Sequence, residues 1–274
     1  MRPSSEPLPP LPTQATALAV REPLAVSALQ LAYALVGYVL AMGSVAYLLA
    51  FLAGVLVPKT ILDGPVASPW VAALIDAGLV LTFGLHHSVT ARRAFKRWWT
   101  RFVPPAIERA TYCIMTAGMT ALLVALWRPI PITVWHLPGL APGAAFGALF
   151  LGTATMMVAA SFHFGHFAFF GLRQALDRVL ERAPAEPRFT ARLLYGLVRH
   201  PISVGWMLLP FLHAHLTVGH VVFGLATVVY IVVATPFEER DLIAELGETY
   251  RAYRRRVPAF LPRLVRRRAP RREG

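Results

Sequence analysis

Residues 195–240 of this chain read YGLVRHPISVGWMLLPFLHAHLTVGHVVFGLATVVYIVVATPFEER. Two apolar stretches, 202–213 and 217–236, lie between the polar motifs Arg199-His200-Pro201 and Glu238-Glu239. Backbone groups in lipid need internal hydrogen-bond partners, so both stretches are expected to be helices. Because only three residues separate them, the helices form a hairpin that returns the chain to the side it left. The two polar motifs are therefore expected to meet.

The rest of the chain has the composition of a membrane protein. Hydrophobic residues make up 56% of its 274 residues, and the mean hydropathy is +0.55. The predicted spans are 25–57, 70–87, 111–127, 143–170, 202–213 and 217–236. The period-two pattern of a barrel is absent. The sequence therefore predicts an all-α, polytopic membrane helical bundle with about five to six membrane segments, a terminal helical hairpin and a cytoplasmic C-terminal region.

The formal net charge of +13 is distributed unevenly among the loops. Most loop cations belong to two loops: Arg92, Arg93, Lys96, Arg97, Arg101 and Arg109 to 88–110, and Arg173, Arg178, Arg182, Arg188, Arg192 and Arg199 to 171–199. The alternate loops, 58–69 and 128–142, contribute Lys59 and Arg128. By the positive-inside rule, the basic loops and both termini are expected to be cytoplasmic, in a bacterial inner membrane. The charge is thus attributed to topology and contact with membrane lipid, and nucleic acid is not an expected partner.

The two ends of the chain differ from its centre. Residues 1–24 are rich in Pro, Thr and Ala and lack the layout of a removable signal peptide, so they are expected to be a disordered tail. Residues 263–274 are dense in arginine and are expected to lie on anionic lipid headgroups. Between them, residues 25–262 are expected to form one membrane domain, with a cofactor region at about 187–262.

Histidines at membrane depth leave two interpretations open. The candidates are His86, His87, His163, His166, His213, His215 and His220. Polar side chains in a membrane are costly and tend to face a cavity or one another, and paired imidazoles suit iron or zinc. Alternatively, these side chains lie at the interface and bond to water or carbonyls, which is the favoured interpretation for the last three. Cys113 is the only cysteine, which excludes intrachain disulfides and CxxC sites, and no metal ligand set is assigned.

The polar groups at the two ends of the hairpin could bind a ligand that contains a zwitterionic amino-acid group. The pair Glu238-Glu239 can bind an ammonium group, while Arg199, His200 and backbone N–H groups near Pro201 can bind a carboxylate. The aromatic faces available for an adenine ring or a sulfonium cation belong to Phe189, Tyr195, Tyr250 and Tyr253. On chemistry alone, a surface salt-bridge cluster with interface tyrosines explains the same residues equally well.

Three motifs, in this order along the chain, resemble those of a known enzyme superfamily. Arg199-His200-Pro201-x-x-x-Gly205-Trp206 is followed by Glu238-Glu239 and by Gly247-Glu-x-Tyr-x-x-Tyr-x-x-x-Val-Pro258. This set looks like the membrane methyltransferases of the isoprenylcysteine carboxyl methyltransferase superfamily, which use S-adenosylmethionine (SAM) from the cytosolic side. The resemblance and the chemistry above imply these cofactor-binding residues: Pro187, Arg188, Phe189, Thr190, Tyr195, Arg199, His200, Pro201, Gly205, Glu238, Glu239, Tyr250 and Tyr253.

A closer resemblance covers most of the chain from about residue 81 onward. The run HSVTARRAFKRWWTRFVP at 87–104, together with Ile107-Glu108-Arg109, Phe170-Gly-Leu-Arg-Gln174 and Thr217-Val-Gly-His220, is similar to bacterial methanethiol S-methyltransferases. That family converts methanethiol and SAM to dimethyl sulfide and S-adenosylhomocysteine. The resemblance thus implies a small thiol as substrate.

Substrate and base are expected from particular positions. Ala234 stands where the isoprenylcysteine enzymes have an arginine associated with substrate, which favours a small neutral thiol over a prenylated carboxylate. A simple alkyl thiol ionises above the pKa of about 8.5 for free cysteine, so a base is expected to help form the thiolate. His87 and His166 are the candidate catalytic groups. The alternatives are a haem-binding membrane isomerase or redox accessory protein, and a non-enzymatic membrane scaffold.

Overall fold

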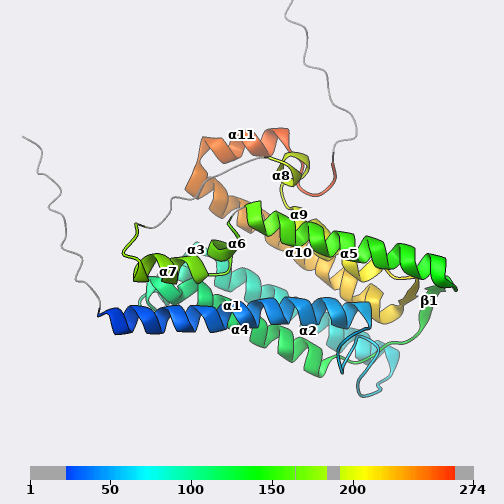
Figure 1. Cartoon of the computed structure of the whole chain (residues 1–274). Coiled ribbons are helices and arrows are strands. Elements are labelled where there is room, and N and C mark those ends of the chain that lie inside the picture. Colours follow the sequence, from blue (N-terminus) through cyan, green and yellow to red (C-terminus); the bar gives the residue numbers. More distant parts are fainter. Residues whose placement is uncertain (1–22, 164, 184–191, 263–274) are drawn as a thin grey trace, which may run out of the picture.

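The computed structural model describes residues 23–163, 165–183 and 192–262. Five of its helices are long and apolar enough to cross a membrane: α1 (Leu24–Ala53), α2 (Pro69–Ala91), α4 (Pro105–Leu126), α5 (Leu140–His163) and α10 (Val218–Leu246). They lie alongside one another in a bundle (Figure 1). The predicted all-α membrane fold is confirmed. The basic tail 263–274 and nearly all of the N-terminal tail lie outside the described residues.

Shorter elements occupy the ends of the bundle. The helical ones are α3 (Arg93–Trp99), α6 (His166–Phe169), α7 (Leu172–Val179), α8 (Leu194–Leu197), α9 (Pro201–Leu208), the 3-10 helix η1 (Leu209–Phe211) and α11 (Glu248–Arg256). The strands β1 (Thr133–His136) and β2 (His215–Thr217) form a small antiparallel sheet. The predicted span 202–213 is thus a short helix, α9 with η1, followed by extended chain.

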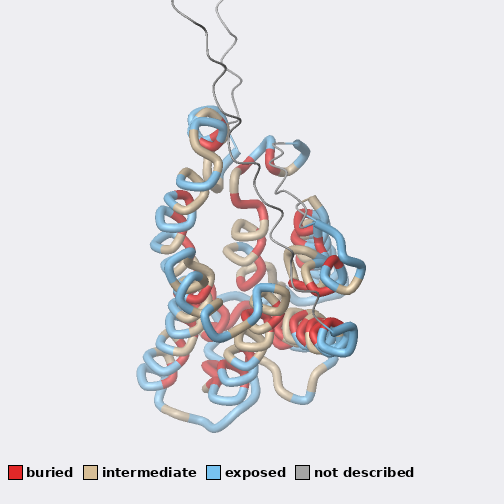
Figure 2. The backbone as a smooth tube through the Cα atoms, turned by 90° about the vertical axis from the view of Figure 1, so that its left-hand side faces the viewer, coloured by how far each residue is buried: buried red, intermediate tan, exposed pale blue. Residues whose placement is uncertain are grey.

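The surface of the bundle is suited to lipid. Leu29, Leu74 and Leu151 are 72%, 76% and 67% exposed, on three different spanning helices. Buried residues follow the sides where helices face each other, while exposed residues follow the outward sides (Figure 2). The core includes Phe51 and Trp127, whose ring centroids lie 5.7 Å apart at a T-shaped angle. Such extensive apolar exposure is expected where lipid replaces water as the solvent.

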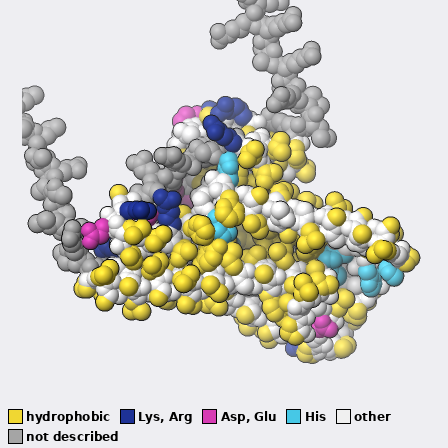
Figure 3. Space-filling view, in the orientation of Figure 1, with side chains coloured by type: hydrophobic (Ala, Val, Ile, Leu, Met, Phe, Trp, Pro, Cys, Tyr) yellow, Lys and Arg dark blue, Asp and Glu magenta, His cyan; other side chains and the backbone are white. Residues whose placement is uncertain are grey.

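The loops separate into two sets at opposite ends of the bundle. At one end, β1 pairs with β2, and the Trp127 indole donates to the Ile61 carbonyl at 3.0 Å. At the other end, Arg92 lies 3.4 Å from Asp241, and Arg109 donates to the Phe169 carbonyl at 2.7 Å. Lys and Arg side chains gather at the α3–α7 end and around α11 in Figure 3, and histidines gather at the far end. Successive loops therefore alternate between the two ends of the bundle, as the apolar runs predicted.

The last long helix carries the acidic pair on a helical extension. The predicted span ended at Pro236, but α10 continues through that proline to Leu246. Proline lacks an N–H and so removes one backbone hydrogen bond from the helix. The adjacent Thr235 hydroxyl donates to the Ile231 carbonyl at 2.8 Å, a second bond within the turn that precedes the proline. The acidic pair thus has fixed helical geometry.

Candidate functional site

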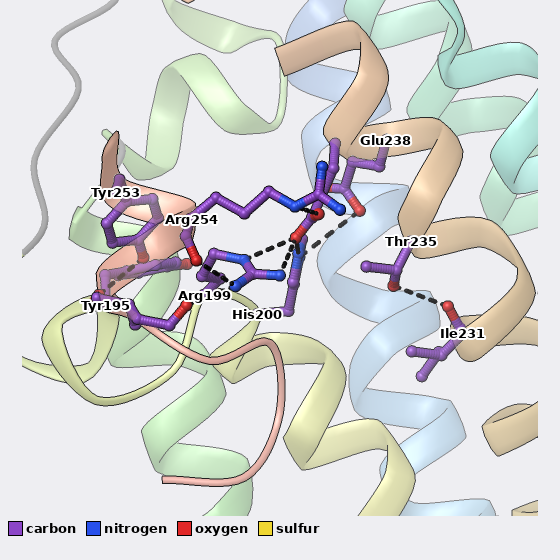
Figure 4. Close-up of polar contacts among 10 residues, drawn as sticks. Tyr195, Arg199, His200, Ile231, Thr235, Glu238, Tyr253 and Arg254 are labelled. Carbon is purple, nitrogen blue, oxygen red and sulfur yellow. Dashed lines mark hydrogen bonds and ion pairs between the residues drawn. The ribbon is translucent and has the colours of Figure 1, made fainter. Parts of the chain in front are cut away.

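Glu239 is the centre of a buried ion network at the basic end of α10. Its side chain is 4% exposed, and its Oε1 accepts from Arg199 Nε at 2.7 Å and lies 2.6 Å from Arg199 NH2. His200 Nε2 lies 3.2 Å from the same oxygen, and Arg254 Nε lies 3.0 Å from Oε2. Figure 4 shows these side chains converging from the start of α9 and from α11. The two ends of the predicted hairpin therefore meet.

Backbone contacts hold the arginine and histidine in place. The N–H groups of Arg199 and His200 donate to the carbonyls of Pro258 and Ala259 at 2.8 and 3.2 Å. The Arg199 guanidinium also donates to the Val257 carbonyl. Pro201 is the first residue of α9, a position where its missing N–H costs nothing because the first turn has no intrahelical acceptor for it. The strip 257–259 after α11 thus fixes the residues that bind Glu239.

Glu238 has different surroundings from its neighbour. Its side chain is 48% exposed, and His200 Nδ1 lies 3.8 Å from Glu238 Oε2. Helix α10 contacts α2 on both sides of Glu238: an added Cβ at Gly84 would lie 2.4 Å from the Tyr230 ring, and Arg92 lies 3.4 Å from Asp241. Glu238 therefore belongs to the stretch of α10 that joins the ion network to α2.

Three predicted tyrosines pack around the network. Tyr195, Tyr250 and Tyr253 are 5%, 2% and 4% exposed, and burial raises the pKa of each, that of Tyr253 to about 12. All three are thus neutral phenols at physiological pH. The Tyr253 hydroxyl donates to the Tyr195 carbonyl at 2.7 Å, which ties α11 to α8. The ring of Tyr195 stacks on His163 with centroids 5.1 Å apart.

The remaining predicted cofactor residues divide into two groups. Gly205 is buried against α5, where an added Cβ would lie 2.3 Å from the Met157 side chain, so close helix packing accounts for this glycine. Pro187, Arg188, Phe189 and Thr190 lie outside the described residues. The structure thus brings Tyr195, Arg199, His200, the acidic pair, Tyr250 and Tyr253 together, and it gives Gly205 a packing role.

The two candidate catalytic histidines lie in different settings. His87, near the end of α2, faces Tyr112 of α4, whose hydroxyl oxygen lies 2.9 Å from each ring nitrogen. His166, at the start of α6, is buried, and both its nitrogens have partners: Tyr38 at 3.0 Å and Ser161 at 2.7 Å. Burial lowers the pKa of His166, so its ring is neutral at physiological pH.

Sequence reasoning missed two residues of these sites. Arg254 completes the Glu239 network, although the run at 250–256 drew attention only to its tyrosines. The available signal was its position four residues after Tyr250, which places both on one face of a helix. Tyr112 carried no local signal, because its partner His87 lies 25 residues away on another helix. Among the described residues, no group of three His, Cys, Asp or Glu side chains forms a candidate metal site.

Comparison with known proteins identifies relatives along most of the chain. It is 43% identical over 239 residues to Methanethiol S-methyltransferase 2 of Bradyrhizobium diazoefficiens, covering 87% of this chain and 92% of the relative. It is 41% identical over 236 residues to Methanethiol S-methyltransferase of Mycobacterium tuberculosis, covering 85% and 96%. The enzyme of the same name from Pseudomonas deceptionensis is 41% identical over 211 residues, covering 77% and 80%. No protein-family profile and no solved structure matches. At this identity and coverage, the chain belongs to the methanethiol S-methyltransferase family.

Proposed function

We propose that this membrane protein transfers the methyl group of SAM to the sulfur of methanethiol, giving dimethyl sulfide and S-adenosylhomocysteine. The observation that carries the proposal is the similarity to enzymes named for methanethiol methylation, which extends over 77–87% of the chain in the relatives described above. The matched region is long enough to include both the spanning helices and the ion network, so the similarity is not confined to one short motif.

The residues around Glu238 fit an amino-acid methyl donor. Glu238 is half exposed and lies 3.8 Å from His200 Nδ1, a longer contact than those of Glu239, so its carboxylate keeps acceptor capacity for the donor's ammonium group. Neutral, buried tyrosines beside it offer aromatic faces to a sulfonium or an adenine ring. The buried pair of Arg199 and Glu239 holds this end of the site rigid, because each group satisfies the other inside the protein.

The proposed chemistry needs positioning and a proton acceptor. When bound, SAM supplies an electrophilic methyl group on a positively charged sulfur. The protein must hold the thiol sulfur in line with that methyl carbon and exclude water, which accounts for much of the rate in bimolecular transfers. The thiol proton must also leave, because thiolate is the stronger nucleophile. An apolar thiol dissolves in lipid, so entry from the membrane between the helices suits this substrate.

Product analysis tests the proposal directly. Purified protein in detergent or lipid is given SAM and methanethiol, and dimethyl sulfide and S-adenosylhomocysteine are measured together. Equal amounts of both products are expected, as one methyl group moves per turnover. Methylation of another acceptor, with no product from any small thiol, would leave the enzyme a methyltransferase but reject the thiol. A Soret absorption band in the purified protein would instead favour a haem protein.

A further inference from the structure

We infer that His87 accepts the thiol proton in this reaction and that Tyr112 is its positioning residue, whereas His166 has a structural role. The inference rests on the proposed function and selects one histidine from the two that the sequence offered. It is carried by the hydrogen bonds of the two rings and by their positions relative to Glu238.

His166 has no free nitrogen with which to act as a base. The Ser161 hydroxyl donates to the Val158 carbonyl at 2.7 Å, so its oxygen accepts from His166 Nδ1–H. The other nitrogen, Nε2, is then unprotonated and accepts from the Tyr38 hydroxyl at 3.0 Å. The Phe162 ring stacks on the imidazole with centroids 4.3 Å apart. This chain of bonds ties the end of α5 to α1 and engages every polar atom of the ring.

His87 retains the capacity to take a proton. The Tyr112 hydroxyl donates to the His87 carbonyl at 3.4 Å, so its oxygen, 2.9 Å from both ring nitrogens, accepts from the nitrogen that carries a hydrogen. The other nitrogen is then unprotonated and has no donor from Tyr112. Phe83 stacks on the ring at 5.6 Å with an interplanar angle of 14°, so the imidazole has an apolar face beside its polar edge. Methanethiol likewise has an apolar methyl group beside a polar S–H group, so its shape and polarity suit this surface of the ring.

Helix packing brings His87 and Tyr112 to the level of the proposed donor site. Tyr112 is 7% exposed, and the Arg109 guanidinium lies 4.5 Å from the centroid of its ring, which restrains that ring by a cation–π contact. Helix α2 contacts α10 on both sides of His87: an added Cβ at Gly84 would lie 2.4 Å from the Tyr230 ring, and Arg92 lies 3.4 Å from Asp241. Glu238 lies on the stretch of α10 between these two contacts, so the thiol-activating pair and the proposed donor carboxylate occupy the same level of the bundle.

The charged groups facing His87 favour thiolate formation. Arg92 follows His87 by five residues, at the end of α2, and the Arg109 guanidinium of α4 lies 4.5 Å from the centroid of the Tyr112 ring. Arg92 is partly neutralised by Asp241 of α10 at 3.4 Å. Positive charge near the thiol stabilises an anionic sulfur.

The S–H bond of methanethiol breaks, and its proton moves to the free nitrogen of His87. The sulfur electron pair forms the new carbon–sulfur bond as the methyl carbon separates from the donor sulfur, which keeps the electrons of the broken bond. The proton then leaves His87 for solvent, so dimethyl sulfide, S-adenosylhomocysteine and one proton are the products. Tyr112 contributes by holding the imidazole in one orientation.

Thiol acidity provides the test. Ethanethiol and 2,2,2-trifluoroethanethiol have similar sizes, but the fluorinated thiol is much more acidic and needs less help to ionise. His87→Asn is expected to lower kcat/KM for ethanethiol by about a hundredfold or more, the usual scale of general base catalysis. The loss for trifluoroethanethiol should be at least tenfold smaller. Tyr112→Phe should change the ratio between the thiols in the same direction, by up to about tenfold, the worth of one hydrogen bond.

Matched controls separate this role from general damage. Tyr38→Phe and His166→Asn remove the analogous tyrosine–histidine contact at the other site. They can lower both rates by loosening the fold, but the ratio between the two thiols should stay at the wild-type value. An unchanged ratio in folded His87→Asn protein would overturn the inference, and so would an equal change of the ratio in His166→Asn. If wild-type protein methylates neither thiol and forms no dimethyl sulfide from methanethiol, the proposed function fails instead.

Discussion

At the scale of single residues, two adjacent glutamates have opposite surroundings. Consecutive residues on a helix point about 100° apart, so Glu239 faces α9 and α11 while Glu238 lies on a more exposed side of α10. Glu239 is 4% exposed and bound by three basic side chains, whereas Glu238 is 48% exposed. One carboxylate is thus committed to the fold, and the other is available to a ligand.

Replacement of Glu238 should therefore weaken donor binding without unfolding the protein. Glu238→Gln keeps the shape but removes the charge, and a hydrogen bond to a charged group contributes about 1.5–3 kcal/mol. SAM affinity is expected to fall roughly tenfold or more. Calorimetric titration of the folded variant measures this, and affinity equal to that of the wild type would reject the assignment.

Replacement of Glu239 should instead lower the stability of the fold. Glu239→Gln leaves the Arg199 guanidinium, whose side chain is 10% exposed, without its ionic partner. Loss of one member of a buried ion pair costs about 3 kcal/mol or more. Thermal unfolding in detergent should therefore begin at a clearly lower temperature than for Glu238→Gln. Equal unfolding temperatures for the two variants would show that the network does not stabilise this end of the protein.

At the scale of elements, apolar runs predicted the spanning helices but not all of their ends. The eleven residues of α9 and η1 are about 18 Å long, too short for a bilayer core of about 30 Å. The chain covers the remainder in extended form, and β2 pairs with β1 because its backbone groups need partners. That pairing joins Thr133 to Thr217 and His136 to His215, so no local pattern reveals it. The continuation of α10 through Pro236 was hidden for a similar reason, since proline usually ends a helix.

The close contact between α2 and α10 yields a prediction at this scale. An added Cβ at Gly84 would lie 2.4 Å from the Tyr230 ring, so Gly84→Ala forces the two helices apart. Overpacking of this kind costs about 1–3 kcal/mol. Gly78→Ala, on the same helix, is the matched control, because nothing lies within 4 Å of its added Cβ. Unfolding temperatures should fall for the first variant alone. A similar fall for both would indicate a general effect of alanine in α2.

At the scale of the whole molecule, the site depends on elements far apart in the sequence. The motifs predicted the meeting of Arg199 and His200 with the acidic pair, because a hairpin must return to the side it left. They did not predict that Glu239 is the buried partner, since the choice between adjacent carboxylates depends on how α10 is rotated against α9. The pairing of His87 with Tyr112 likewise follows from the packing of α2 on α4, which no spacing in the sequence encodes.

The orientation of the bundle gives the last prediction. The basic loops lie at one end and the loops at 58–69 and 128–142 at the other, and from this the positive-inside rule predicts that both termini are cytoplasmic. In a background with Cys113→Ala, single cysteines replace Val66 and Phe102, which are 91% and 69% exposed. A membrane-impermeant maleimide applied to intact cells should label the Val66→Cys protein alone. Lysed cells should show labelling of both, which controls for reactivity. Because SAM is made in the cytoplasm, labelling of Phe102→Cys in intact cells would place the ion network on the wrong side for its proposed donor and overturn both assignments.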